Sequence, residues 1–226
     1  MKLKKQIKVG IDSPVAAGAG TISKMLAKHY NLIYCDTGKI YRYLARMLII
    51  HKPKNEFSYL KKISKKINLN KLKSKSLLSD EVALVASQIA KKLRVRKLVI
   101  KFQKNLAYKP PKKFNGSILD GRDINSKIIK NADFKFFITA NSYVRAKRRY
   151  KEYKNMGKSI KFAEVLRSMK KRDKEDRTRK HSKLKKTRDS YLINTSNLSI
   201  KSSFLKVKNI MDRKLKKYAR NNKRKN

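Results

Sequence analysis

The pattern of apolar and polar positions near the N-terminus predicts strands that alternate with helices. Ile7–Asp12 alternates and then becomes apolar before a Ser-Pro pair, which is typical of a strand that ends in a turn. Apolar residues at helical spacing predict a helix over Ala19–Tyr30. A second strand over Leu32–Cys35 and a helix over Gly38–Ile50 follow. This strand–helix–strand–helix order favours an α/β fold with a parallel sheet and helical crossovers.

The middle of the chain predicts a small insert and then a long helix. Residues 51–79 carry few signals of regular structure and fit one or two short helices. Ser79 and Asp80 offer an N-cap for a single helix that runs to about Tyr108 and ends before Pro110. Its predicted apolar stripe consists of Val82, Val85, Ile89, Leu93 and Ile100.

The C-terminal half predicts three more strands and three charged helices, and it shows no internal repeat. The strands are expected over Ser117–Gly121, Phe134–Thr139 and Tyr191–Asn194. The helices are expected over Asn141–Asn155, Ser159–Arg177 and Ser199–Arg220, the last with Phe204, Val207 and Met211 directed inward. The basic stretch 214–226 is expected to fray as a tail.

Length and composition narrow the class of protein. The chain has 226 residues, of which 40% are hydrophobic, enough for one sizeable core. Cys35 is the only cysteine and the three histidines are scattered, which excludes a disulfide scaffold and a Cys/His zinc site. The longest apolar run, residues 44–50, is interrupted by Arg46 and is too short to span a bilayer, and no secretory leader follows Met1. We therefore expect a soluble, cytoplasmic protein.

The charge is extreme. Lys and Arg number 63 against 15 Asp and Glu, so the formal net charge is +48. Such a surface attracts RNA, DNA, anionic lipid and free nucleotides. Two interpretations stand side by side: lysine-rich drift at solvent-facing positions, as an AT-rich genome favours, and selected polyanion binding. The aromatic interleaving of single-strand binders is lacking, because Trp is absent and most Tyr and Phe lie in apolar segments.

The loop after the first strand is the main candidate for anion binding. Residues 13–21 lie between a strand and a helix N-terminus, where free backbone N–H groups and the helix dipole favour phosphate. Against the Walker A pattern, Gly18 matches the second glycine, but Ser13 replaces the first and Ala19 replaces the lysine. Gly20 takes the Ser/Thr position, with Thr21 next. By pattern alone, a tight turn of small residues explains this loop equally well.

Downstream motifs change that balance. They are Asp36-Thr37-Gly38-Lys39-Ile40-Tyr41-Arg42, Ser87-Gln88-Ile89-Ala90, Asp120-Gly121-Arg122-Asp123, Arg145-Ala146-Lys147-Arg148-Arg149 and the stretch from Arg172 to Arg179. In this order and at these spacings the chain resembles the cytidylate kinases, bacterial enzymes that phosphorylate CMP and dCMP. The resemblance runs from about Val9 to the last helix. It is specific as a set, although no single motif suffices.

The resemblance implies a P-loop nucleoside monophosphate kinase fold, with a parallel sheet of about five strands and flanking helices. The implied domains are a core over 1–50 and 80–226, a helical lid over about 141–190 and a short nucleotide-binding insert over 51–79. Residues 214–226 remain a basic tail. The implied protein is a monomer that uses ATP with Mg²⁺ and takes CMP or dCMP as the acceptor. No metal-ligating residue is assigned.

The resemblance also implies roles for individual residues. The ATP cradle comprises Ser13, Pro14, Val15, Ala16, Ala17, Gly18, Ala19, Gly20 and Thr21, with Arg145 and Arg149 on the lid. The residues implied to bind the acceptor phosphate are Thr37, Arg42 and Arg122. Those implied to recognise cytosine are Ser87, Arg96 and Asp123, and those implied to contact the sugar are Asp176 and Arg172. Arg148, Arg172 and Arg179 are expected as catalytic cations. Arginine suits these roles because it binds phosphate bidentately and stays charged.

Plainer interpretations of the same residues remain open. The run of arginines over 145–149 is also typical of a solvated helix face. Asp176 fits a surface salt bridge, and Asp120-Gly121 fits a simple turn. Ser87 fits a residue that faces a helix groove.

The chain departs from the family at three places. Ala19 replaces a lysine that contacts the transferring phosphate, a loss worth about 10²–10³ in rate. We hypothesise that Lys39, where the family has a small residue, supplies the missing cation. The second departure is Asn125-Ser126-Lys127, where the family continues with Gly-Thr and apolar residues. The third is the lysine-rich stretch 181–186, where the family has apolar and proline residues.

The leading prediction is ATP-dependent phosphorylation of CMP or dCMP to the diphosphate. One alternative is a catalytically impaired kinase fold that binds RNA or ribosomes through its basic surface. Another is a kinase for a different small acceptor.

Overall fold

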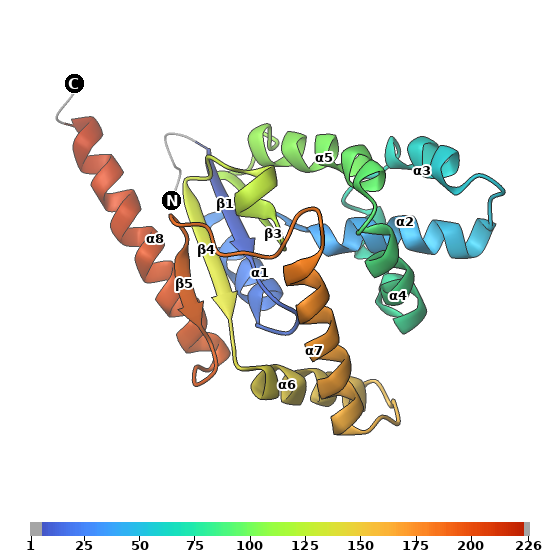
Figure 1. The fold of residues 1–226 in the computed structure, drawn as a ribbon. Coiled ribbons are helices and arrows are strands. Elements are labelled where there is room, and N and C mark those ends of the chain that lie inside the picture. Colours follow the sequence, from blue (N-terminus) through green and yellow to red (C-terminus); the bar gives the residue numbers. More distant parts are fainter. Residues whose placement is uncertain (1–5, 224–226) are drawn as a thin grey trace.

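A five-stranded parallel sheet forms the centre of the computed structural model, which describes residues 6–223 (Figure 1). The strands lie in the order β2-β3-β1-β4-β5, so β1 is central and pairs with both β3 and β4. Val9 lies between Ile118 and Phe134, all three fully buried. The strands are β1 (Ile7–Asp12), β2 (Ile33–Asp36), β3 (Gly116–Gly121), β4 (Phe134–Thr139) and β5 (Tyr191–Asn194). The predicted α/β class and parallel sheet are confirmed.

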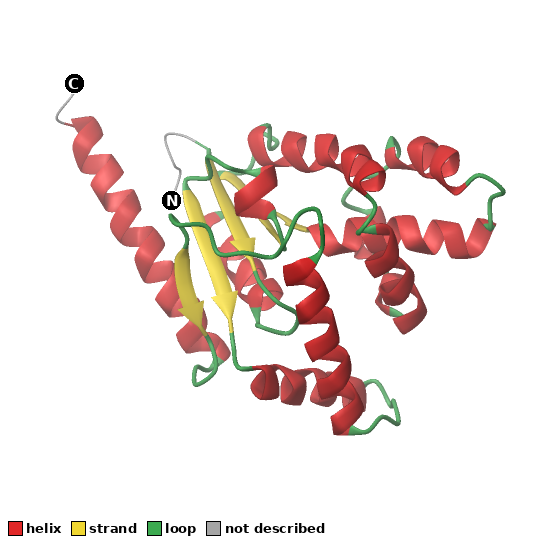
Figure 2. Cartoon of the chain, viewed as in Figure 1, coloured by secondary structure: helices red, strands yellow, loops and turns green. Residues whose placement is uncertain are grey.

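Helices cover both faces of the sheet and extend beyond its edges (Figure 2). The α-helices are α1 (Ala19–Tyr30), α2 (Thr37–His51), α3 (Glu56–Ser64), α4 (Asp80–Ile89), α5 (Leu93–Tyr108), α6 (Ser142–Asn155), α7 (Phe162–Thr178) and α8 (Ile200–Lys223). Shorter turns are η1 (Lys71–Lys73), η2 (Lys75–Leu78) and the π-helical η3 (Ile124–Ile128). Most predicted boundaries agree within one or two residues, and α1 agrees at both ends.

The core consists of two apolar clusters. In one, α1 and α8 pack with the strands, with Leu26 and Met211 fully buried. The other joins α2, α4 and α5 to the end of β3, with Leu44 and Val99 fully buried. Both clusters draw on the sheet, which gives the strand ends between them a rigid support.

The single long helix predicted from Ser79 to Tyr108 is wrong. Two helices cover this stretch, and the chain turns between them at Ala90–Lys92. Ser79 does cap α4, its hydroxyl accepting from Val82 N at 3.3 Å. The break arises because α4 packs on α2 while α5 packs on β3, and one straight helix cannot cover both surfaces. Leu93, predicted on the buried stripe, is exposed at the start of α5.

The helices α6 and α7 form an arm beyond the carboxyl ends of the strands, which the arrowheads in Figure 2 mark. Ala146, Val165 and Met169 are buried between the two helices. Val15 and Ala16 of the 13–21 loop pack against the same cluster. The arm is therefore in direct contact with the predicted phosphate loop.

The insert and the C-terminal segment follow the sequence in part. Residues 51–79 hold α3 and the two 3-10 turns, as the prediction of short helices requires. The prediction that 214–226 frays is corrected. The helix α8 continues through Lys223, because Leu215 is still buried against the core. Residues 224–226 lie outside the described residues. Within 6–223, no helix has both the length and the apolar character needed to cross a membrane.

Candidate active site

A cavity of about 770 Å³ opens at the carboxyl ends of the strands, the usual ligand position in parallel α/β sheets. Its walls come from the 13–21 loop, the first turn of α2, the end of α4, the end of β3, and the arm of α6 and α7. We call it the main cavity. All the predicted site residues line it except Lys39 and Arg145. Residues far apart in the sequence thus meet at one place.

The 13–21 loop turns sharply into α1. Ala16 has a φ of +57° and Gly18 a φ of +90°, both in the left-handed region. Glycine adopts that region freely, whereas alanine does so at a cost of about 1 kcal/mol or more. Ser13 N donates to Gly121 O at 3.1 Å, which ties the start of the loop to the end of β3. The turn places the N-terminus of α1 at the cavity wall, as an anion site requires.

Beneath the loop, Asp12 is a fully buried carboxylate at the end of β1. It accepts hydrogen bonds from Ile124 N at 2.7 Å and Asn125 N at 3.0 Å. Burial raises the pKa of Asp12 to about 7, although the two backbone donors act against this. Asp12 therefore joins β1 to the turn after β3 and supports the floor of the site.

A group of arginines surrounds one carboxylate in the main cavity. Arg122 Nε lies 2.8 Å from Asp176 Oδ2, and Arg179 Nη1 lies 3.1 Å from Asp176 Oδ1. Burial acts to raise the pKa of Asp176, but Arg122 and Arg179 outweigh it and the pKa is lowered. The Asp176 carboxylate is thus paired with two arginines, Arg122 just after β3 and Arg179 just after α7. It does not form a solvent-exposed surface salt bridge.

Arg172 is the exception in this group, because the Nε of its side chain is buried and has no hydrogen-bond partner within 6–223. Burial, and next the nearby Arg122, lower the pKa of Arg172 to about 10. Arg42 and Arg149 act in the same direction. Buried polar groups are normally satisfied, so a cation in a cavity with an unpartnered Nε is suited to bind an anion.

Arg42 is positioned by the last residues of the insert. Its Nη1 donates to Leu77 O at 2.8 Å. None of residues 51–79 lines the main cavity; the nearby walls come from α4 and α5. The insert therefore contacts the site through Arg42.

Another part of the main cavity wall holds a buried ion pair. Arg96 Nη2 lies 2.7 Å from Asp123 Oδ2, and both residues are buried. The Arg96 guanidinium lies 5.4 Å from the ring centroid of Tyr41, and its Nη1 donates to Ala90 O at 2.8 Å. Ser87 lines the same region from α4. The break between α4 and α5 therefore supplies a backbone acceptor that orients Arg96.

The arginines of α6 do not form a solvated face. Arg145 is 3% exposed, pairs with Asp173 and donates to Val15 O at 3.1 Å. Its guanidinium is thus engaged by protein atoms behind the loop. Arg148 Nη2 donates to Thr195 O at 2.7 Å, and Thr195 Oγ1 donates in turn to Ala17 O at 3.0 Å. These contacts join the arm to the 13–21 loop.

Lys39 receives no support as the replacement cation, because it is half-buried and is not among the residues that line the main cavity. Lys24 of α1 and Arg148 of α6 do line it. Arg148 Nη1 lies 4.0 Å from the point where a Cβ on Gly18 would be. Arg148 is thus a cation that the fold brings close to the loop, and Lys24 lines the same cavity.

Sequence reasoning missed a pair of neighbouring carboxylates at the ends of two strands. Asp36 is the last residue of β2 and Asp120 the last but one of β3. The two lie side by side in register and line the main cavity. Burial, and next Asp36, raise the pKa of Asp120 to about 8, and Tyr34 OH donates to Asp120 Oδ2 at 3.0 Å. The available signal was their place at the carboxyl ends of adjacent parallel strands. The turn interpretation of Asp120-Gly121 is wrong, because Asp120 is a buried part of β3.

Comparison with known proteins agrees with this geometry. The cytidylate kinase family profile matches residues 9–218. Proteins named cytidylate kinase are similar: that of Bartonella tribocorum is 39% identical over 205 residues, covering 88% of this chain and 92% of that protein. That of Mesorhizobium japonicum is 36% identical and covers 90% and 93%.

A solved structure of an uncharacterized protein from Eubacterium ventriosum matches the fold alone. It has a TM-score of 0.55 at 16% sequence identity and covers 92% of this chain and 99% of that one. The sequence relatives favour a kinase over the RNA- or ribosome-binding alternative. The match over most of the chain, together with the site geometry, shows that this chain belongs to the cytidylate kinase family.

Proposed function

We propose that this protein transfers the γ-phosphoryl group of ATP to CMP or dCMP. The observation that carries the proposal is the half-buried Arg172, whose Nε is buried without a hydrogen-bond partner, in one cavity with the 13–21 loop and the Arg96–Asp123 pair. Phosphoryl transfer needs placement and cations on the developing charge rather than a covalent group from the protein. Arg172 and its neighbours Arg42 and Arg122 supply that charge around the exchanged phosphate.

In this proposal the base of the acceptor nucleotide binds where Ser87, Arg96 and Asp123 line the main cavity. Cytosine carries an exocyclic amine, which a carboxylate such as Asp123 accepts from, while Arg96 donates to N3 or O2. Uracil has a donor at N3 and an acceptor at position 4, the reverse of cytosine. The same side chains are then mispaired, and uracil is rejected. Asp176 accepts from the sugar hydroxyls. Thr37 and Arg42 hold the acceptor phosphate.

ATP lies with its phosphates on the 13–21 loop in this proposal. The backbone N–H groups of the loop and the N-terminus of α1 bind the phosphate oxygens. Lys24 and Arg148, which line the cavity beside the loop, are the cations available where Ala19 replaces the lysine. Thr195 holds Arg148 in position through its backbone carbonyl.

Mg²⁺ is expected with ATP, and the residues present fit it. Asp36 and Asp120 form a carboxylate pair whose mutual repulsion a divalent cation relieves. Mg²⁺ is usually held by one or two carboxylates together with waters and substrate phosphates. When bound, Mg²⁺ neutralises charge on the donor phosphates. Asp36 and Asp120 would hold it beside Gly20.

In this proposal α6 and α7 act as the lid, over about 141–190, and residues 51–79 as the small insert beside the acceptor site. The protein acts as a monomer in the cytoplasm, where both nucleotide substrates occur.

The direct test is ADP production by the full chain with ATP and Mg²⁺, comparing CMP, dCMP, UMP and AMP as acceptors. We expect turnover with CMP or dCMP and at least tenfold lower kcat/KM with UMP and AMP. Absence of turnover with all four acceptors, in a protein that is folded by circular dichroism, would contradict the proposal.

A further inference from the structure

Two of the three departures from the family pattern meet in a second cavity. Lys127 belongs to the first of these stretches, and Lys183 and Lys185 belong to the second. All three line a cavity of about 460 Å³ between α5, η3 and the segment after α7. We call it the basic cavity. Lysines more than fifty residues apart in the sequence thus line one cavity.

The basic cavity is strongly cationic. It is lined by seven lysines: Lys97, Lys104, Lys127, Lys130, Lys180, Lys183 and Lys185. None of them forms an ion pair with a carboxylate within the described residues, so their charge is not compensated. Asp123 is the one acidic residue in the wall, and it is engaged by Arg96. The ligand that fits such a wall carries several negative charges.

The segment after α7 is held against the body rather than free. Leu184 is buried, and its N donates to Asp176 O at 2.7 Å. Arg179 Nε donates to Ser182 O at 2.7 Å. These bonds hold Lys183 and Lys185, whose side chains are exposed, on either side of the buried Leu184. The fold therefore presents their charge at a defined position.

The basic cavity shares a wall with the main cavity. Tyr41, Arg96 and Asp123 line both. Arg96 and Asp123 are the residues proposed to recognise cytosine. A ligand in the basic cavity therefore lies directly behind the acceptor base, where it biases how Arg96 and Asp123 are held.

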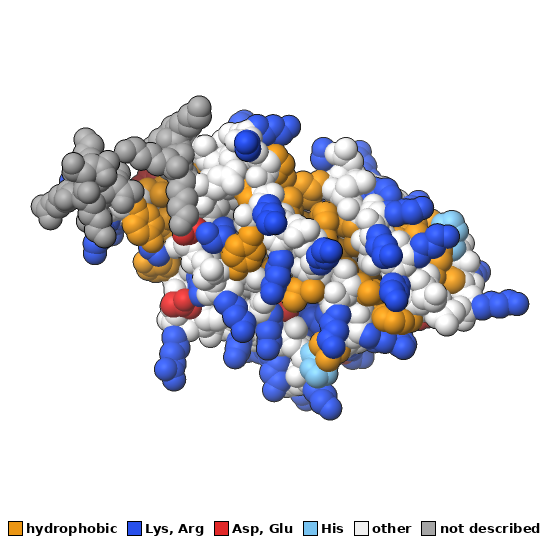
Figure 3. All heavy atoms as spheres, turned by 90° about the horizontal axis from the view of Figure 1, so that it is seen from above, with side chains coloured by type: hydrophobic (Ala, Val, Ile, Leu, Met, Phe, Trp, Pro, Cys, Tyr) orange, Lys and Arg blue, Asp and Glu red, His pale blue; other side chains and the backbone are white. Residues whose placement is uncertain are grey.

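We propose that the basic cavity is an effector site for a small anion that carries two or more linked phosphate groups, such as the phosphate chain of a nucleoside triphosphate or polyphosphate. Its volume lies within the range of small-molecule sites. A hollow of this size favours a compact ligand over an extended nucleic acid, which needs a continuous track. Lys and Arg side chains are scattered over the face seen in Figure 3. The seven lysines of the basic cavity differ because they line a single hollow.

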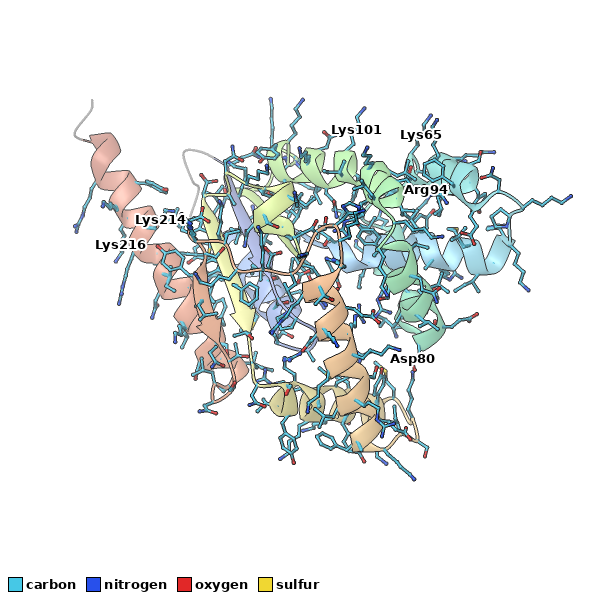
Figure 4. All side chains as sticks on the ribbon, in the orientation of Figure 1. Lys65, Asp80, Arg94, Lys101, Lys214 and Lys216 are labelled. Carbon is cyan, nitrogen blue, oxygen red and sulfur yellow. The ribbon has the colours of Figure 1, made fainter. Side chains whose placement is uncertain are left out.

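The test measures binding of inorganic tripolyphosphate to the full chain by titration calorimetry, with CMP and a non-hydrolysable ATP analogue saturating the main cavity. The variant carries Lys127→Gln, Lys183→Gln and Lys185→Gln. The matched control carries Lys65→Gln, Lys101→Gln and Lys216→Gln, which lie just after α3, on α5 and on α8, outside both cavities (Figure 4). Both variants lose the same formal charge.

We expect saturable binding of about one tripolyphosphate by the unmodified chain and the control. The cavity variant should bind about tenfold more weakly, because each lysine–phosphate contact is worth up to about 1 kcal/mol. Distant charges are screened, so the control should change less than twofold at physiological salt. Equal losses in the two variants, or no saturable binding, would overturn the proposal.

A single-stranded oligouridylate serves as the second probe. If the cavity variant weakens the oligonucleotide selectively and leaves tripolyphosphate unchanged, the cavity is part of a nucleic-acid track and the proposal is wrong. The outcome is separable from the proposed kinase function, which stands or falls on turnover of CMP by the unmodified chain. A further readout is the KM for CMP, which tripolyphosphate should change at least twofold in the unmodified chain but not in the cavity variant.

Discussion

Arg145 and Asp173 form a buried ion pair across the two helices of the arm, with Nη2 and Oδ2 at 2.5 Å. A second bond runs from Arg145 Nη1 to Asp173 Oδ1 at 3.2 Å, so the pair is bidentate. The same guanidinium donates to Val15 O. One arginine thus couples α6 to α7 and both helices to the 13–21 loop.

Removal of Asp173 should leave Arg145 as an unpaired buried charge. We expect Asp173→Ala to lower the free energy of unfolding by about 3–5 kcal/mol, measured by urea denaturation. The control is Glu56→Ala, which breaks the exposed pair with Lys92 and should cost less than about 1 kcal/mol. Similar losses in the two variants would show that the arm is not held by this pair.

Arg172 should be a functional residue that costs stability. Its buried charge lies near Arg122 and Arg42, so Arg172→Gln relieves repulsion in the unliganded protein. We expect an equal or higher melting temperature together with a loss of about 10²–10³ in kcat/KM for CMP. Lys171→Gln, at an exposed neighbouring position, should change neither quantity. Retained activity in Arg172→Gln would remove Arg172 from the proposed mechanism.

The missing lysine of the 13–21 loop can be put back. Ala19 lines the main cavity, so the side chain of Ala19→Lys can extend toward the proposed phosphate position. We expect kcat to rise about 10-fold, less than the 10²–10³ that an unreplaced cation on the transferring phosphate is worth, because Lys24 and Arg148 replace it only in part. Ala19→Met matches the length without the charge and should not raise kcat. No difference between the two would mean that another cation, such as Lys24 or Arg148, already performs this role.

Base selection should depend on Asp123. In Asp123→Asn the carboxylate that accepts from the cytosine amine is lost, so kcat/KM for CMP should fall about 10–100-fold. The value for UMP should fall less, and the ratio of the two is the diagnostic quantity. Asp133→Asn removes a carboxylate that pairs with Lys8 and does not line the main cavity, and it should leave the ratio unchanged.

The pKa of Asp12 predicts a dependence of stability on pH. Burial raises it to about 7 from an ordinary value of 3.8, so the folded protein binds a proton that the unfolded chain has released in this window. Stability from this group is therefore lost as pH rises from about 4 to 7. Carbon-13 NMR of labelled aspartate should show a carboxyl with a midpoint near pH 7 that disappears in Asp12→Asn, distinct from the raised midpoint of Asp120. A midpoint near 4 for the carboxyl lost in Asp12→Asn would contradict the assignment.

Local patterns in the sequence were sufficient for most of the elements. The strand over 134–139 and the helix over 19–30 agree with prediction because each has a clean apolar period and a clear boundary signal. The long helix over 79–108 was wrong because helical periodicity persists through Lys91 and Lys92. Only the competing surfaces of α2 and β3 make the chain turn there.

The candidate site divides in the same way. The 13–21 loop, Arg42, Arg122, Asp123, Arg172 and Asp176 were found from motif order, and the fold places them on one cavity. Lys39 was predicted from its position in a motif but does not line this cavity. Position in a motif does not determine the direction of a side chain. The Asp36–Asp120 pair was missed because each residue alone is an ordinary strand end.

By itself, the sequence determined the strands, the helices and the set of arginines available for phosphate, because these depend on residue type and on neighbours a few positions away. Only the tertiary structure decided which charges meet. It put Arg172 among other arginines without a full set of partners, and it gathered Lys127, Lys183 and Lys185 around one hollow. Salt screens the interaction of distant charges, so only charges that lie close together in space affect one another strongly. In this protein the packing of the parallel sheet and its helices sets those distances, and the order of residues along the chain does not.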